Sequence, residues 1–94
     1  MPRYDVAHVR EQGTNLIIIP LNSSFGQMPK EDQAQEIATL QKHANGAGLA
    51  GTVVPVWEAG GGRIAFIAPQ QWHPFFSSIN GLWLANNINK WISW

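Results

Sequence analysis

The stretch that decides the fold is Pro69–Trp94, which reads P-Q-Q-W-H-P-F-F-S-S-I-N-G-L-W-L-A-N-N-I-N-K-W-I-S-W. It holds four of the five tryptophans of the chain and a single formal charge, that of Lys90. A segment with so many aromatic side chains and so little charge must be buried, against the chain's own sheet or against another molecule. We therefore expect it to organise the rest of the chain and to lie close to any binding surface.

Within this stretch the sequence predicts one helix, which begins near Pro74 or Ser78 and continues to Ile92. On a helical wheel one face collects the residues expected to pack on a sheet: Gly81, Leu84, Ala85, Ile88, Trp91 and Ile92. A second group points substantially away from that face and is available to a partner: Ile79, Leu82 and Trp83. The last helix is thus expected to contact both the sheet and another molecule.

Upstream, four short apolar segments have the composition of strands: Tyr4–Arg10, Leu16–Leu21, Thr52–Glu58 and Arg63–Ala68. A helix is predicted between the second and the third, from Pro29 to about Asn45, with Gly46 as its stop. The predicted order is ββαββα in a single domain, residues 1–94. Two hairpins separated by a helix build an α+β fold, with a four-stranded, mainly antiparallel sheet and two helices packed on one face.

The predicted strands are apolar on both faces, and Leu16–Leu21 (L-I-I-I-P-L) is the clearest case. An antiparallel sheet with one face in water alternates apolar and polar residues, so the second face of this sheet needs a cover. No predicted element is left over to provide it. The simplest cover is a second copy of the chain.

Two prolines, Pro20 and Pro55, lie inside predicted strands. Proline cannot donate a hydrogen bond to the neighbouring strand. We therefore expect each of them at a sheet edge, at a strand end or at a bulge.

Composition and charge disfavour several classes of partner. The 94 residues carry six basic and six acidic side chains, and charged residues make up 13% of the chain, against about 25% in typical domains. The basic residues are scattered and form no stripe that suits a phosphate backbone, so we expect no nucleic-acid partner. The longest apolar run is far shorter than a membrane span, and the start of the chain lacks the apolar core of a signal peptide. We expect a cytoplasmic protein with no membrane partner.

No catalytic, cofactor or metal site is predicted. The chain has no cysteine, and its three histidines (His8, His43 and His73) show no spacing typical of metal ligands. Asp5 and His8 lie three apart on a predicted strand and so point to opposite faces. No motif places a base beside any serine. These absences favour a non-catalytic protein without a cofactor.

The segment Glu58–Arg63 (E-A-G-G-G-R) has some features of a binding loop. Its glycines expose backbone amides, and Arg63 could hold an anionic group. It lacks the length and the lysine of a phosphate-binding loop. We favour the simpler interpretation of a flexible hairpin turn flanked by a cross-strand pair between Glu58 and Arg63.

Two functional hypotheses remain open. The first is a module that self-associates as a homodimer through its apolar sheet face, its Trp-rich C-terminal segment, or both, although another protein partner is also possible. The residues expected at this interface are Trp83, Trp94, Ile79 and Leu82. The alternative is a small-molecule-binding protein with an aromatic pocket between the C-terminal helix and the sheet. Its ligand-binding residues would be Arg63, His73 and Trp72.

Overall fold

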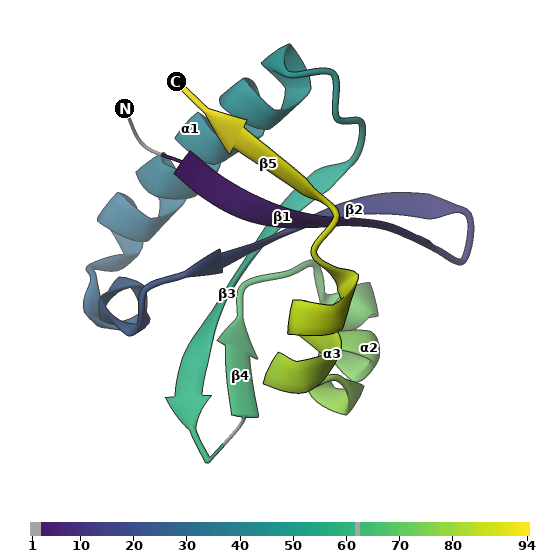
Figure 1. Ribbon diagram of the computed structural model, residues 1–94. Helices are drawn as coiled ribbons and strands as arrows, with labels where there is room; N and C mark the ends of the chain where they lie inside the picture. The colour runs from purple at the N-terminus through teal and green to yellow at the C-terminus, as the bar shows by residue number, and fades with distance from the viewer. Residues whose placement is uncertain (1–2, 62) are drawn as a thin grey trace.

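The computed structural model describes residues 3–61 and 63–94 and contains one five-stranded sheet with helices on both faces (Figure 1). The strands are β1 (Arg3–Glu11), β2 (Thr14–Leu21), β3 (Thr52–Gly60), β4 (Arg63–Phe66) and β5 (Lys90–Ser93). The helices are α1 (Lys30–Gly46), α2 (His73–Ser78) and α3 (Gly81–Asn87), with 3₁₀ turns η1 (Ser23–Gln27) and η2 (Gln70–Trp72). The α+β class is as predicted. The described residues form one strand and one helix more than expected.

The sheet is mixed, and its strand order is β4-β3-β2-β1-β5. Neighbouring strands are antiparallel except β2 and β3, which run parallel from the pair Leu16 and Thr52 to the pair Leu21 and Trp57. A parallel pair needs a crossover, and here α1 provides it. The two predicted hairpins therefore exist, and they lie side by side because β2 of the first pairs with β3 of the second. The carboxyl ends of this parallel pair point to the same edge of the sheet.

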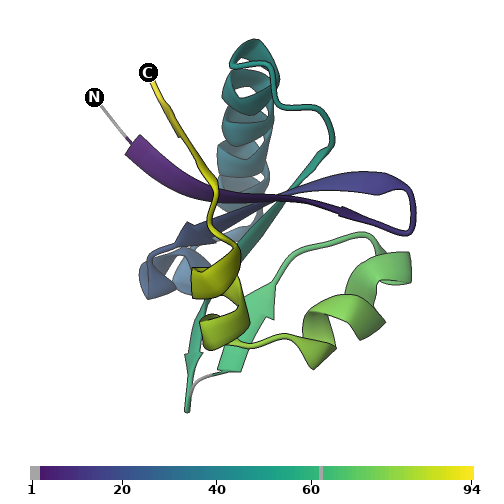
Figure 2. The same ribbon diagram turned by 45° about the vertical axis from the view of Figure 1, so that its right-hand side comes forward.

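Helices cover both faces of the sheet (Figures 1 and 2). Leu40 and Ala44 of α1 pack with Val6, Ile17, Ile19, Val53 and Ile92 on one face. On the other face, Trp72, Phe76 and Leu84 pack with Ala7, Leu16, Ile18, Val54 and Val56. The prediction that both helices pack on one face is wrong. Strands β2 and β3 are apolar on both sides because each side faces a core made by the chain's own helices.

The prediction of one continuous C-terminal helix to Ile92 is also wrong, since this segment forms α2, α3 and β5. The side chain of Asn80 accepts a hydrogen bond from the backbone N–H of Trp83 and so begins a new helix. After α3 the chain becomes extended at Ile88. Asn89 then pairs its side chain with both backbone groups of His8, at 2.9 Å each, and leads the chain into β5. Asparagine favours caps over helix interiors, and here this preference outweighs the helical spacing of the apolar residues.

The two prolines occupy different positions in the sheet. Pro20 lies next to the last residue of β2, as expected for a strand end. Pro55 lies inside β3, between β2 and β4, so its expected place at an edge, end or bulge is wrong. The carbonyl of Pro55 accepts a hydrogen bond from the N–H of Ile67, at 3.2 Å, just beyond the last residue of β4. The backbone nitrogen and carbonyl of one strand residue point to the same side, so the nitrogen of Pro55 also faces β4, just beyond its end. The lack of an N–H at Pro55 therefore removes no hydrogen bond to β2.

Helix α1 matches its predicted range closely. Glu31 and Asp32 lie in its first turn, where negative charge favours the helix dipole. Gly48, with φ of +88°, provides the left-handed residue after its end, a role predicted for Gly46. No helix in the described part of the chain is both long and apolar enough to cross a membrane.

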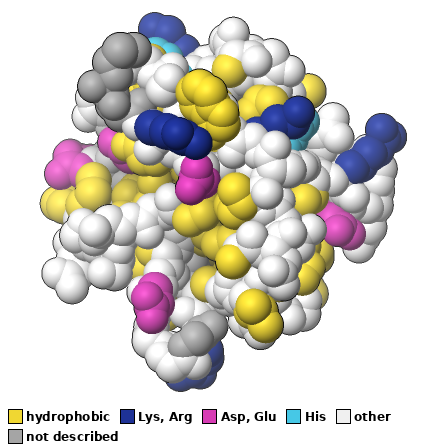
Figure 3. Space-filling view, in the orientation of Figure 1, with side chains coloured by type: hydrophobic (Ala, Val, Ile, Leu, Met, Phe, Trp, Pro, Cys, Tyr) yellow, Lys and Arg dark blue, Asp and Glu magenta, His cyan; other side chains and the backbone are white. Residues whose placement is uncertain are grey.

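Three large apolar side chains remain exposed: Ile67, Leu82 and Trp91. Leu82 is 71% exposed and Trp91 is 58% exposed. Figure 3 shows apolar side chains near the middle of one side of the molecule, with acidic and basic side chains around them. Most aromatic residues are thus buried or half-buried, and a few apolar side chains remain available for contacts.

Candidate ligand-binding pocket

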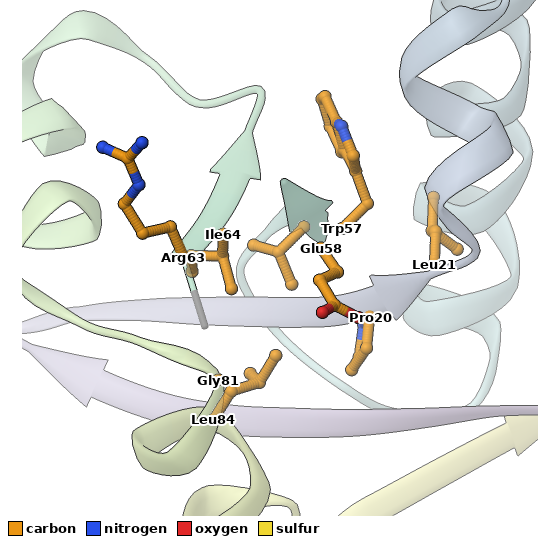
Figure 4. A pocket seen from close by; sticks show the side chains of 9 residues that line it. Pro20, Leu21, Trp57, Glu58, Arg63, Ile64, Gly81 and Leu84 are labelled. Carbon is orange, nitrogen blue, oxygen red and sulfur yellow. The ribbon is translucent and has the colours of Figure 1, made fainter. Parts of the chain in front are cut away.

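A pocket of about 360 Å³ opens between α3 and the strands β2, β3 and β4 (Figure 4). Strand β2 lines it with Pro20 and Leu21, β3 with Val56, Trp57 and Glu58, β4 with Arg63 and Ile64, and α3 with Gly81 and Leu84. This volume lies at the lower end of the range typical of small-ligand sites, about 300–1,000 Å³. The lining is mostly apolar, and its charged members are Glu58 and Arg63.

The topology of the sheet determines where this pocket lies. Strands β2 and β3 are parallel, and the pair Leu21 and Trp57 is the last in their register. In open sheets with parallel strands, ligands bind in the crevice outside the carboxyl ends of the strands. The crossover through α1 therefore creates the kind of edge at which such sheets bind ligands.

The apolar walls are extensions of the core on the α2 and α3 face. Val56 is completely buried, and Leu84 is 7% exposed and packs in the same cluster. Helix α3 is held by the Asn80 cap and by Trp83, whose ring lies edge-on to Phe75 with centroids 5.7 Å apart. The pocket is thus built on packed elements, which favours a preformed shape.

Trp57 is positioned by the η1 turn. Its ring packs at a tilt against Phe25, with centroids 5.1 Å apart. A β-carbon on Gly26 would overlap Nε1 of the indole. A glycine at position 26 therefore allows Trp57 to occupy its place at the pocket, since any larger residue would force the ring or the turn to shift.

The two charged lining residues do not pair with each other. Glu58 lies opposite Ile64 and Arg63 lies opposite Gly60, because the strand pairing shifts between Glu58 and Gly60. The predicted cross-strand pair of Glu58 and Arg63 is therefore wrong. Figure 4 shows the guanidinium of Arg63 extending away from Gly81 and Leu84. Among the described residues the one ion pair joins Arg3 and Asp5, at 3.9 Å, so the carboxylate of Glu58 has no basic partner there.

The structure brings one of the three predicted ligand-binding residues to this pocket. Arg63 lines it, and the pocket lies between the last helix and the sheet as that hypothesis expected. Trp72 is instead buried in the core, and His73 is exposed, with Nε2 2.9 Å from the carbonyl oxygen of Ala68. The walls are mainly aliphatic, and Trp57 is the aromatic residue among them.

The four predicted interface residues differ in their surroundings. Leu82 is exposed. Trp83 and Ile79 are half-buried and pack against the core. Trp94 is half-buried and stacks on Tyr4 and His43, with centroids 5.4 and 4.0 Å away. Contacts within the chain therefore cover part of the surface of Ile79, Trp83 and Trp94, while the side chain of Leu82 stays largely free.

Sequence reasoning missed the exposure of Trp91 and most of the pocket lining. The predicted helix has Trp91 on the same face as Ile92, but in β5 neighbouring residues point to opposite sides, and of these two only Ile92 is buried. The guanidinium carbon of Arg3 lies 4.8 Å from the centre of the Trp91 ring. The sequence does contain one indication of the pocket, the helix predicted between the two hairpins. A helix in that position can connect two parallel strands, whose carboxyl ends then lie at the same edge of the sheet.

No group of three or more histidine, aspartate or glutamate side chains within residues 3–61 and 63–94 is placed to hold a metal ion. No known protein family, curated protein or solved structure matches the chain. The geometry of the pocket is therefore the basis on which a function can be argued.

Proposed function

We propose that the protein is a non-catalytic binding module that takes a small, mainly apolar ligand in the pocket between α3 and the carboxyl ends of β2 and β3. The observation that carries this proposal is the pocket itself, a hollow of about 360 Å³ with apolar walls and two charged residues among its lining. Small-ligand sites combine these features, with apolar walls for affinity and a few polar groups for orientation.

The packing of the walls supports the same proposal. Val56 and Leu84 belong to the core, so the pocket does not have to be assembled when a ligand arrives. A preformed site avoids the entropy cost of ordering side chains on binding. Burial of an apolar ligand would add favourable free energy in proportion to the area removed from water.

The experiment is a screen of small apolar compounds by thermal shift and by ¹H–¹⁵N spectra of the full chain. A true ligand raises Tm by linkage and shifts the resonances of Trp57, Ile64 and Leu84. The variant Ile64→Phe should weaken binding because the larger ring fills the pocket. The matched control is Ile37→Phe, a half-buried isoleucine on α1, on the opposite face of the sheet. Binding that is insensitive to Ile64→Phe, or a broad library without a hit, would contradict the proposal.

Self-association as a homodimer is a second candidate, and the exposure of Leu82 and Trp91 favours it. Tryptophan is enriched among the residues that contribute most of the binding energy at interfaces, and Leu82 would add apolar area to such a contact. The need for a second copy to cover the sheet no longer supports this candidate, since helices of the same chain cover both faces. The exposure of Leu82 and Trp91 is therefore the observation that supports a homodimer.

Light scattering after size exclusion, over about a hundredfold dilution, tests the second candidate. A dimer would have a mass near twice 10.4 kDa, and Trp91→Ala together with Leu82→Ser would shift it towards the monomer. The control is Ile67→Ser, which removes an exposed apolar residue from another part of the surface. A monomer at every concentration would remove this candidate.

A further inference from the structure

We infer that the ligand of this pocket is a cation, an ammonium group carried on an apolar body, with the carboxylate of Glu58 as its counter-ion. The inference rests on the proposed function of the pocket and adds the chemical class of the ligand. It follows from the arrangement of the two charged lining residues relative to the apolar walls.

The carboxylate of Glu58 is a negative charge in the pocket lining that can pair with a ligand. The shift in pairing between β3 and β4 places Ile64, and not Arg63, opposite Glu58. No basic residue in the described part of the chain forms an ion pair with Glu58. A cation that enters the pocket would therefore gain a carboxylate without displacing an existing partner, which favours binding of positive charge.

Arg63 is poorly placed to select an anion. Its guanidinium extends away from Gly81 and Leu84, so its charge lies away from the wall that α3 contributes (Figure 4). An anion bound against those walls would meet the carboxylate of Glu58, which lines the same pocket. Repulsion between like charges opposes such a ligand.

The remaining lining suits the other parts of an apolar amine. Val56, Ile64 and Leu84 offer aliphatic surface to an apolar body. Neighbouring residues of a strand point to opposite faces, and the ring of Trp57 extends away from Glu58 (Figure 4), so the carboxylate is the group that meets the ammonium. A ligand with an ammonium group at one end and a hydrocarbon at the other would satisfy both kinds of surface.

Three probes with one skeleton test the charge: 3-phenylpropylamine, 3-phenylpropan-1-ol and 3-phenylpropanoate. Each is titrated into the full chain, and Kd is measured from the ¹H–¹⁵N shifts of Trp57, Glu58 and Ile64. The amine should bind about two- to fivefold more tightly than the alcohol, which is the range expected for an exposed ion pair, and the carboxylate should bind most weakly. Glu58→Gln should abolish the difference between amine and alcohol. The matched control Glu31→Gln, an exposed acid on α1, should preserve it, although it changes the net charge by the same amount.

The outcomes separate this inference from the proposed function. Equal binding of the three probes at the pocket would overturn the charge inference and leave the pocket standing. Strongest binding of the carboxylate, lost in Arg63→Gln, would overturn it in favour of an anion site. A preference for the amine that survives Glu58→Gln would overturn the role of Glu58. If no probe shifts the pocket resonances, both the inference and the proposed pocket fail.

Discussion

The ring of Trp94 lies parallel on the ring of His43, with centroids 4.0 Å apart and planes that differ by 3°. Tyr4 also stacks on Trp94, at 5.4 Å. His43 belongs to α1 and Tyr4 to β1, so this group of three rings joins the residue after β5 to the longest helix and to the neighbouring strand. These contacts stabilise β5, a short strand at the edge of the described sheet that pairs there only with β1.

We predict that Trp94→Ala lowers the free energy of unfolding by about 2 kcal/mol, because it removes a half-buried indole and its stacking on two other rings. Trp91→Ala, which removes an exposed indole from the other side of the same segment, should cost less than about 1 kcal/mol. Guanidinium unfolding followed by far-ultraviolet circular dichroism measures both without relying on tryptophan fluorescence. Equal losses would show that the three-ring stack adds no stability.

Asn89 should matter more to stability than the neighbouring asparagines. Its side chain donates to the carbonyl and accepts from the N–H of His8, so it continues the β1–β5 pairing with an amide group. We predict that Asn89→Ala costs about 1–2 kcal/mol and speeds hydrogen exchange at the His8 amide. Asn86→Ala, an exposed position on α3, should change stability by less than about 0.5 kcal/mol. Unchanged exchange at His8 in the Asn89 variant would refute this role.

Gly51, which precedes β3, is a position where alanine should be strongly unfavourable. Its φ is +128°, and a β-carbon there would lie 2.5 Å from the carbonyl oxygen of Asn15. We predict that Gly51→Ala costs about 2 kcal/mol or more, through backbone strain and the clash with β2. Gly46→Ala, at the open end of α1, should raise stability by about 0.5 kcal/mol. Tm values of the two variants should therefore move in opposite directions, and a Tm for Gly51→Ala close to that of the wild type would be inconsistent with the strain.

Tyr4 should make stability depend on pH in the alkaline range. Burial raises the pKa of the Tyr4 hydroxyl above its usual 10.0, and the negative charge of Glu36 and its hydrogen bond at 3.4 Å raise it further. Because the folded pKa exceeds the unfolded one, the stabilisation is complete below pH 10.0 and is lost as the pH rises towards the folded pKa. Urea unfolding between about pH 9 and pH 11 should show a steeper loss for the wild type than for Tyr4→Phe. Parallel slopes for the two proteins would contradict the shift, and Glu36→Gln should give an intermediate slope.

Much of the secondary structure could be predicted because it is encoded locally. The β-branched, apolar run Leu16–Leu21 forms most of β2, and the turn-rich segments around it end the strand. Pro29 with two acids after it marks the start of α1. These signals require no knowledge of distant residues, and the structure confirms both elements.

The strand β5 could not be predicted in the same way. Lys90–Ser93 is only four residues long, and tryptophan and isoleucine at these spacings fit a helix as well as a strand. The open edge of β1 and the Asn89 bonds to His8 decide between the two, and both depend on residues at the far end of the chain. The placement of α1 and α3 on opposite faces depends in the same way on the parallel crossover.

The candidate site was predictable in outline only. The sequence led to a pocket between the last helix and the sheet and to Arg63 as a lining residue. It did not lead to Trp57 or Pro20, because their convergence requires the β2–β3 register. Trp72 and His73 are near the pocket residues in sequence, but Trp72 of η2 packs in the core and His73, at the start of α2, lies beside the carbonyl of Ala68.

The pairing of β1 with β5 joins residues 3 and 93, so it closes the longest loop among the sheet's strand pairs. Loop closure over such a separation is entropically costly, and folding rates fall as native contacts become more distant in sequence. The β1–β2 hairpin and the β2–α1–β3 crossover use no residue of β5, whereas β5 pairs only with β1 among the described strands. Until it docks, the outer edge of β1 presents unpaired backbone groups to other chains. In the folded chain β5 covers this edge, and the bonds of Asn89 to His8 and the stacking of Trp94 on Tyr4 and His43 hold the covering strand in place.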